Sequence, residues 1–428
     1  SRRKQNDMID SHCHLNSRHF DDDREIAIAR AVSDGVVSFM NIGFDRESLR
    51  DTLELVERYP FMFGAAGVHP HDAATLDDAL EADVRRALDH PRIVAVGEIG
   101  LDFYRNLAPR DVQEAVFRKM IALAREKNKP IVIHCRDAFH EVIETLASEG
   151  AAYRGIFHAF SGDPAEAQRI FDLGFHVGIG GVVTYRNARL SETVASIPIE
   201  KIVLETDSPY LTPHPWRGKR NEPSFLTHVA RMVAKIKGLS LAEVSRITNE
   251  NYLAAMGITS DALLRPVYRI DESVYIQSAS AEPADLDAIP ADAVDEAVLT
   301  GVADPLDGLD RVLALAARAK EREWRVRVNA GGLANHAAGR DVTPDLAGKV
   351  DEIVIVFFGA TAEAHNRLAQ PALSAEEWES VRDFIRCSRA AGIDTVCEFV
   401  ATPGFEPEPC RVFARELGAQ YDIRMYRS

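Results

Sequence analysis

The 428-residue sequence predicts an α/β protein of two domains, the first of them a (β/α)8 TIM barrel. In the first part of the chain, eight short β-rich runs alternate with amphipathic helical patterns over about 250 residues, the size of such a barrel. This pattern breaks after Gly257, where a stretch rich in Ala, Asp and Pro has no clear periodicity. Strand and helix patterns then alternate again, which predicts a second, smaller α/β domain with a mainly parallel sheet.

The expected strands of the first domain are 7–13, 36–43, 61–68, 92–100, 130–135, 155–160, 175–181 and 201–207, with helical patterns such as 111–129 and 165–174 between them. A doubly wound open sheet has the same alternation and is the alternative. In the second domain we expect strands at 273–277, 296–301, 324–332, 351–359 and 393–401, and helices at 307–323 and 375–392. The predicted domains are therefore 7–258 and 259–428, after a basic, disordered tail at 1–6.

The composition limits the classes of function. The formal net charge is −16, from 32 Lys and Arg against 37 Asp and Glu in residues 1–258 and 18 against 29 in residues 259–428. Proteins that coat nucleic acid show a basic face, so any such contact is expected to be local, near a cleft, or mediated by metal. The five scattered cysteines favour a reducing, cytoplasmic setting over a disulfide framework. No apolar run of about 18 residues and no signal-peptide pattern occurs, so we expect no membrane span.

Ionisable residues gather where the expected strands end. Asp10, His12 and His14 alternate along the first strand and therefore share a face. The other strand-end residues of this kind are His69, Glu98, His134, His158 and Asp207. In a barrel these positions all lie at the C-terminal mouth, where active sites of this fold are built. Four histidines and two carboxylates on five strands predict a site for divalent metal.

The same residues allow two ions. One set comprises His12, His14, Glu98 and Asp207, and the other comprises Glu98, His134 and His158, so that Glu98 would bridge the ions. Two such ions suit the hydrolysis of a phosphodiester, because they activate a water and clamp both oxygens of an in-line displacement. Mixed nitrogen and oxygen ligands fit Mg²⁺, Mn²⁺, Zn²⁺ or Fe²⁺ and do not choose between them.

Seven motifs carry a resemblance to a known family. In order they are "DSHCHL", "GVHPH", "GEIGLDF", "IHCRDA", "FHAFSG", "ETDSPYLTP" and "RGKRNEP", and over residues 7–258 they resemble the TatD family of the metal-dependent amidohydrolase superfamily. The resemblance implies a TIM barrel with a two-metal site, and a 3′-to-5′ deoxyribonuclease with some activity on RNA that works by two-metal hydroxide attack. Carried over residue by residue, it makes His12, His14, Glu98, His134, His158 and Asp207 the metal ligands, with Asp10 beside them.

Further roles are assigned around these ligands. We expect Asp207 and the bridging Glu98 to be catalytic, with Asp207 orienting the attacking water or taking its proton. Glu205 is expected to support the site from deeper in the barrel. The residues expected to contact substrate phosphates are His69, Arg136, Arg217, Lys219 and Arg220. For His71, a phosphate contact and capping of local structure are alternative expectations. Glu222 is expected to pair with one of the arginines.

The second domain resembles radical S-adenosylmethionine proteins that are associated with TatD nucleases, and its expected fold is a partial barrel of that kind. The resemblance rests on "VNAGGLANHAAGRDVTPDLAGKVDEIVI" and "EEWESVRDFI". Those enzymes hold an iron–sulfur cluster on closely spaced cysteines, whereas the loop after 273–277 reads "SASAEPADLDAIP". We therefore expect no cluster and no radical chemistry, and a packing or docking module whose partner is unknown.

Three hypotheses for function follow. The leading one is a metal-dependent exonuclease that acts on DNA ends and requires no organic cofactor. The second keeps the metals but changes the bond, giving an ester or amide hydrolase such as an aminoacyl-tRNA deacylase, because the ligand set suits both. The third is a scaffold in which the acidic C-terminal domain recruits a partner. The basic "RGKR" segment, 217–220, favours a phosphate-bearing substrate.

Overall fold

The computed structural model describes residues 7–150, 153–259, 267–278, 280–301, 304–369, 372–402 and 404–427. The predicted tail at 1–6 lies outside these ranges. The chain forms two compact units, one built mainly from Val36–Arg265 and the other mainly from Pro266–Ser428. Among the described residues, no helix is both long and apolar enough to cross a membrane.

The first unit is a parallel barrel, as predicted. Its strands are β1 (Met8–Cys13), β2 (Val36–Gly43), β3 (Met62–Ala66), β4 (Ile93–Asp102), β5 (Ile131–Arg136), β6 (Gly155–Phe157), β7 (His176–Ile179) and β8 (Ile202–Leu204). They are hydrogen-bonded in sequence order, which excludes the doubly wound alternative. A parallel bridge between Cys13 and Ser208 joins β1 to the segment after β8.

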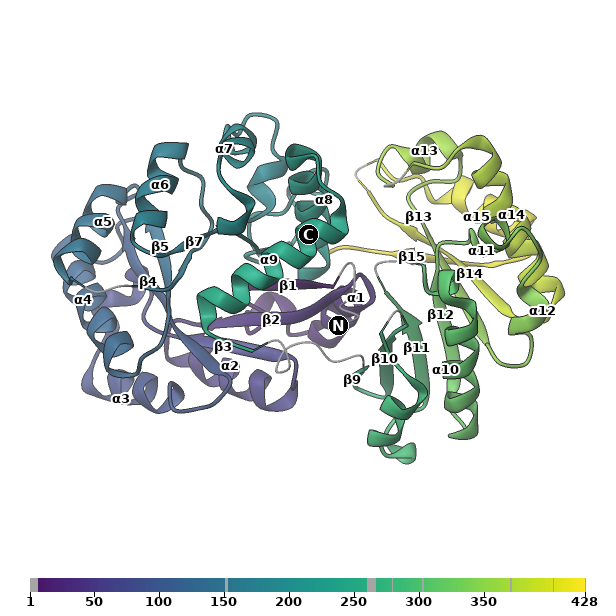
Figure 1. Cartoon of the computed structure of the whole chain (residues 1–428), viewed down its shortest axis with the longest axis horizontal. Helices are drawn as coiled ribbons and strands as arrows, with labels where there is room; N and C mark the ends of the chain where they lie inside the picture. Colours follow the sequence, from purple (N-terminus) through teal and green to yellow (C-terminus); the bar gives the residue numbers. More distant parts are fainter. Residues whose placement is uncertain are drawn as a thin grey trace. The chain divides into compact units, whose positions relative to one another are not determined.

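Helices surround this sheet (Figure 1). They are α1 (Arg24–Ser33), α2 (Arg46–Arg58), α3 (Asp78–Ala87), α4 (Arg110–Glu126), α5 (Phe139–Ser148), α6 (Pro164–Asp172), α7 (Leu190–Ser196), α8 (Leu226–Lys237) and α9 (Leu241–Met256). Because both faces of the strands are covered, β1 to β4 are buried along their whole length, and the sequences of β2 to β4 are largely apolar.

Helix α9 closes the barrel domain. It begins with a capping box formed by Ser240 and Glu243, and it packs Tyr252 and Met256 into the barrel core. It ends at Gly257, which has a φ of 66° and accepts the left-handed conformation at low cost. The end of the barrel pattern in the sequence therefore coincides with a C-cap that glycine favours.

The second unit contains one mixed sheet. Its strands are β9 (Val267–Ile270), β10 (Ser273–Gln277), β11 (Glu296–Thr300), β12 (Arg325–Ala330), β13 (Glu352–Phe357), β14 (Asp394–Val400) and β15 (Gln420–Arg424). Strands β10 to β15 are parallel and follow sequence order, while β9 pairs antiparallel with β10 at the edge. The mainly parallel sheet was predicted, but the two edge strands were not.

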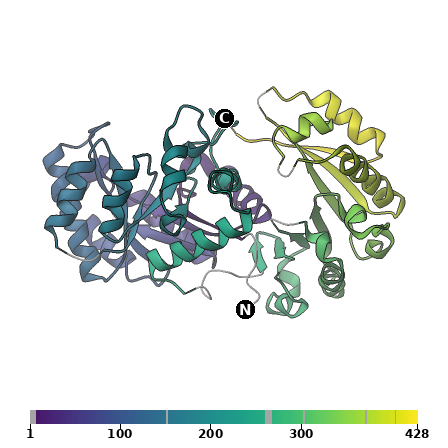
Figure 2. The same cartoon turned by 45° about the horizontal axis from the view of Figure 1, so that its top comes forward.

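The helices of this unit are α10 (Leu309–Glu321), α11 (Ala334–Ala338), α12 (Thr343–Leu346), α13 (Ala362–Asn366), α14 (Ala375–Ala390) and α15 (Pro407–Glu416) (Figures 1 and 2). In β12 and β13, fully buried residues alternate with partly exposed ones. Polar partners occupy the less buried positions, where Arg327 pairs with Glu296 at 3.3 Å and Arg325 with Glu352 at 2.7 Å. On β12, one face therefore contributes Val326 and Val328 to the apolar core, while Arg325 and Arg327 on the other face form ion pairs.

Candidate metal centre

Two histidines lie close together at the C-terminal end of strand β1, His12 within the strand and His14 just after it. His12 and His14 lie two residues apart, and their Nε2 atoms are 3.3 Å from each other. Backbone hydrogen bonds fix this segment, because the His14 N–H donates to the Ser208 carbonyl and the Asp207 N–H donates to the His12 carbonyl. These same bonds place Asp207 beside the two rings, with its Oδ1 3.3 Å from His14 Nε2 and 3.7 Å from His12 Nε2.

Glu98 lies in β4 between this group and a second one. Its Oε2 is 3.4 Å from His12 Nε2 and 4.0 Å from His14 Nε2. Its other oxygen, Oε1, is 2.7 Å from His134 Nδ1 and 2.6 Å from His158 Nε2. The two oxygens of one carboxylate thus face two different sets of histidine nitrogens.

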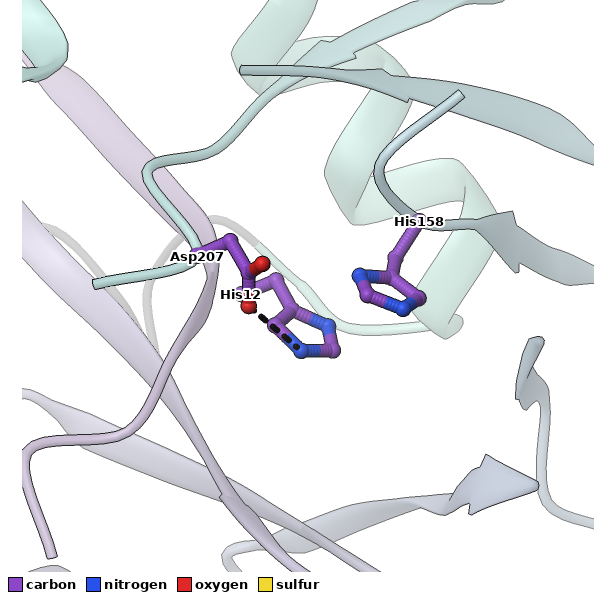
Figure 3. A group of neighbouring side chains, drawn as sticks. All are labelled: His12, His158 and Asp207. Atoms are coloured by element: carbon purple, nitrogen blue, oxygen red, sulfur yellow. Dashed lines mark ion pairs between the residues drawn. The ribbon is translucent and has the colours of Figure 1, made fainter. Parts of the chain in front are cut away.

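His158, one of the residues that face Oε1 of Glu98, also lies near His12 (Figure 3). His158, which follows β6, stacks its ring on that of His12 with centroids 4.0 Å apart. His12, His158 and Asp207 form one of three overlapping triads whose ligand atoms lie within 4.8 Å of one another. His69 belongs to another triad, with Glu98 and His134, and its Nε2 is 3.5 Å from Glu98 Oε1.

The spacing of these atoms suits metal ligation. Ligands about 2.1 Å from a tetrahedral ion lie roughly 3.4 Å from each other. The distances among His12, His14, Glu98 and Asp207 scatter around that value. The buried Nε2 atoms of His12 and His14 face each other at 3.3 Å, an arrangement that suits a shared metal ion. Mixed nitrogen and oxygen donors fit Zn²⁺, Mn²⁺ or Mg²⁺. All six predicted ligands are brought together.

The charges of the site are tuned against one another. Burial, together with the nearby His158, lowers the pKa of His12 to about 4, so its ring is neutral and able to ligate. Burial also raises the pKa of Glu98, but His158, His69 and the hydrogen-bonded rings outweigh it and hold this pKa well below its usual value. The Glu98 carboxylate therefore stays ionised.

Asp102, at the end of β4, orients His134 and was not singled out from the sequence. Its Oδ2 accepts hydrogen bonds from His134 Nε2 at 3.0 Å and from His71 Nε2 at 2.9 Å, and its Oδ1 accepts from the Arg105 N–H at 2.7 Å. Holding Nε2 as the donor leaves His134 Nδ1 free for the centre, as in many metal sites. The signal was present, because "GLDF" places this carboxylate near the strand end in one of the quoted motifs.

Two further carboxylates hold the loops that carry ligands. Asp10 accepts bonds from the N–H of Thr206 at 2.9 Å and from its hydroxyl at 2.6 Å, and so fixes the residue before Asp207. Glu205 Oε1 accepts from the N–H of Ala159, the residue after His158, at 2.5 Å. These contacts agree with the supporting positions expected for Asp10 and Glu205.

The expected phosphate contacts are distributed unevenly. Arg136 ends β5 with an exposed side chain, and Arg217 is exposed in the loop after β8, stacked on Tyr185 at 4.3 Å. Lys219 is half-buried in the same loop. His69 joins the metal ligands instead of lying apart from them, and His71 bonds to Asp102.

Arg220 differs from the prediction. Its guanidinium makes two hydrogen bonds to Asp23, at 2.7 and 2.9 Å, and its side chain is only 3% exposed. Glu222, expected to pair with an arginine, lies 3.4 Å from it. A buried guanidinium that is paired with a carboxylate is not accessible to a phosphate. In the basic segment 217–220, Arg217 and Lys219 therefore remain as candidates for phosphate contacts. The sequence shows a cluster of charges but not which of them turns inward.

Comparisons with known proteins agree with this geometry. The model of the family described as TatD related DNase matches residues 9–257. The uncharacterized metal-dependent hydrolase YabD of Bacillus subtilis (strain 168) is 42% identical over 246 residues, which are 57% of this chain and 96% of that protein. The 3′-5′ ssDNA/RNA exonuclease TatD of Rahnella sp. (strain Y9602) is 35% identical over 254 residues, with the same shares. The crystal structure of YJJV, a TatD homologue from Escherichia coli K12, aligns with a TM-score of 0.57 at 27% identity, over 59% of this chain and 98% of that one.

Fold and site together define a metal-dependent hydrolase built on an α/β barrel. Within that class, the chain belongs to the TatD related DNase family, because the family model covers more than half of its residues. The matched region ends where helix α9 ends, so the main part of the second unit, Pro266–Ser428, lies outside it.

Proposed function

We propose that this protein is a divalent-metal-dependent phosphodiesterase that removes nucleotides from the 3′ ends of DNA, with RNA ends as a second substrate. The observation that carries the proposal is the placement of Glu98, whose two oxygens face two separate groups of ligand atoms. A carboxylate shared in this way suits a pair of divalent ions, and such pairs serve in-line displacement at phosphorus.

The residues present would hold two ions through the six ligands, with His69 next to the second group. When bound, such ions supply Lewis-acid polarisation of a phosphoryl oxygen and lower the pKa of a water. The protein supplies the rest. Burial raises the pKa of Asp207, but the hydrogen bond with His14 and the electrostatic effect of the neighbouring histidine rings hold it below its usual value, so this carboxylate is ionised. We assign it to orient the attacking water and to accept its proton at Oδ1.

Substrate recognition is expected to be local. The net charge of −16 disfavours loose coating of a duplex, whereas a strand end that reaches the mouth needs only a few cations. We assign phosphate contacts to Arg136, Arg217 and Lys219, whose positions follow β5 and β8. Relatives in Rahnella sp. and Salmonella typhimurium, each 35% identical, are named 3′-5′ ssDNA/RNA exonucleases, and this supports the same activity here.

The test is hydrolysis of end-labelled single-stranded DNA and RNA by the chelator-stripped protein, refilled in turn with Mg²⁺, Mn²⁺ or Zn²⁺. Products that shorten one nucleotide at a time from the 3′ end support the proposal. Glu98→Gln should lose hydrolysis while the fold is retained, since a neutral amide oxygen replaces a charge shared between the ligand sets. Metal content by mass spectrometry gives a second readout, and Glu54→Gln, an exposed carboxylate on α2, is the matched control.

Three results would count against the proposal. Wild-type protein that takes up metal but cleaves neither DNA nor RNA would refute the nuclease activity and leave only the general class of metal-dependent hydrolase. Aminoacyl esters would then be the next substrates to assay. Shortening from the 5′ end would refute the polarity. A folded, metal-loaded Glu98→Gln variant with near wild-type activity would refute the bridging role.

For the second unit we propose a fold related to radical S-adenosylmethionine proteins that has lost its cluster. The sequence resemblance and the sequential parallel order of β10 to β15 support this relation. The three cysteines of this unit lie on separate elements, with Cys387 in α14, Cys397 in β14 and Cys410 in α15. Such an arrangement does not form a single cluster-binding loop, so packing or docking is the proposed role.

A further inference from the structure

Exposed apolar side chains are concentrated in two loops that follow strands of the barrel. Among the described residues, six large apolar side chains are exposed, and four of them lie in two loops. Tyr104 (62% exposed) and Leu107 (65%) follow β4, while Tyr210 (51%) and Leu211 (37%) follow β8. Apolar groups that gather in this way usually mark a binding surface.

Both loops start from residues of the site. Asp102, which orients His134, is the last residue of β4 and lies two residues before Tyr104. Asp207 accepts the backbone N–H of Tyr210 at its carbonyl, at 2.8 Å, and the Tyr210 ring lies 5.9 Å from the ring of His14. The Tyr210 ring therefore borders the ligand atoms, while Tyr104 contacts Arg136, two residues after the ligand His134.

A guanidinium accompanies one of these rings. The guanidinium of Arg136 lies 4.0 Å from the centre of the Tyr104 ring. Aromatic faces interleaved with cations are the feature that binds single-stranded nucleic acid, because bases stack and phosphates pair.

We propose that Tyr210 and Tyr104 form a stacking platform for unpaired bases of a single strand whose terminal phosphodiester lies at the metal centre. This inference rests on the proposed function and deepens it by assigning the preference for single strands to two named side chains. An internal base of a duplex has both faces covered and cannot stack on such a ring, whereas every base of an unpaired end can do so. A protein partner docked on these loops would cover the catalytic mouth, so the occupant is the substrate itself.

The test compares wild-type protein with Tyr210→Ala and Tyr210→Phe on two single-stranded oligonucleotides. One has ordinary bases, and the other has abasic sites at its last three 3′ nucleotides with the same phosphates. On the ordinary strand, Tyr210→Ala should raise KM roughly 5- to 100-fold with little change in kcat, and Tyr210→Phe should stay near wild type because it keeps the ring. Tyr104→Ala should have the same effect in kind.

On the abasic strand the penalty of Tyr210→Ala should disappear, since no base remains to stack. Ile26→Ala is the matched control, because this side chain in α1 is 53% exposed but lies outside both loops. Equal penalties on both strands, or no change of KM in either tyrosine variant, would overturn the stacking platform while hydrolysis itself persists. A wild-type protein that cleaves neither strand would instead overturn the proposed function, and this inference with it.

Discussion

Asp102→Asn should weaken metal binding at the group that contains His134. Asp102 accepts three hydrogen bonds, two at Oδ2 from His134 and His71 and one at Oδ1 from the Arg105 N–H. An asparagine has one acceptor oxygen, so in either orientation its NH₂ group faces a donor. Losing a hydrogen bond to a charged group costs about 1.5–3 kcal/mol, in line with the 10- to 100-fold losses, about 1.4–2.8 kcal/mol, typical when a ligand's partner is mutated.

Calorimetric titration of Mn²⁺ into the chelator-stripped Asp102→Asn protein measures the loss of metal affinity directly. We expect the affinity of one binding event to fall roughly 10- to 100-fold while the other changes little, because the Asp102 carboxylate bonds to His134, His71 and Arg105 and not to His12, His14 or Asp207. Asp89→Asn, an exposed carboxylate paired with Lys127, is the control, and circular dichroism checks the fold. If both Mn²⁺ affinities matched those of the wild type, the role given to Asp102 would be refuted.

Four further outcomes are expected. Burial lowers the pKa of His134, but its hydrogen bonds to Asp102 and Glu98 raise it to about 9 in the metal-free protein. Mn²⁺ must therefore displace a proton from His134 at pH 7 and should bind more tightly as the pH rises toward 9. Calorimetry in buffers of different ionisation enthalpy counts the released protons, and a count of zero would contradict this prediction. Replacing Arg217 and Lys219 by alanine should raise KM for oligonucleotides and weaken the dependence of KM on salt. The slope of log KM against log salt concentration should fall by up to roughly 0.7 for each charge removed. An unchanged slope would show that neither residue contacts the phosphates of the substrate. Arg220→Met should destabilise the barrel by about 3–5 kcal/mol because it leaves the buried carboxylate of Asp23 without its guanidinium; an unaltered denaturant midpoint would argue against this. Anaerobic reconstitution with iron and sulfide should give no stoichiometric cluster and no cleavage of S-adenosylmethionine, and absorbance together with iron and sulfide analysis decides the point.

Periodicity alone predicted most of the fold. The barrel strands are buried on both faces, so apolar runs such as 36–43 and 92–100 are visible in one dimension. Edge strands give no such signal. Strand β15 is partly or fully exposed along its length, and β9 carries the exposed Arg269 between two buried residues, so neither forms a continuous apolar run. Their pairing is decided by neighbouring strands and not by their own composition.

The sequence by itself determined which residues gather at the centre, because parallel strands bring their C-terminal ends to one mouth and the histidines and carboxylates follow those ends. Only the tertiary structure decided which atoms face each other. It divided the two oxygens of Glu98 between two groups, set Asp102 behind His134, and turned Arg220 inward to Asp23. The physical reason is that strand position fixes where a side chain starts, whereas its partners depend on loops and on residues far away in the chain.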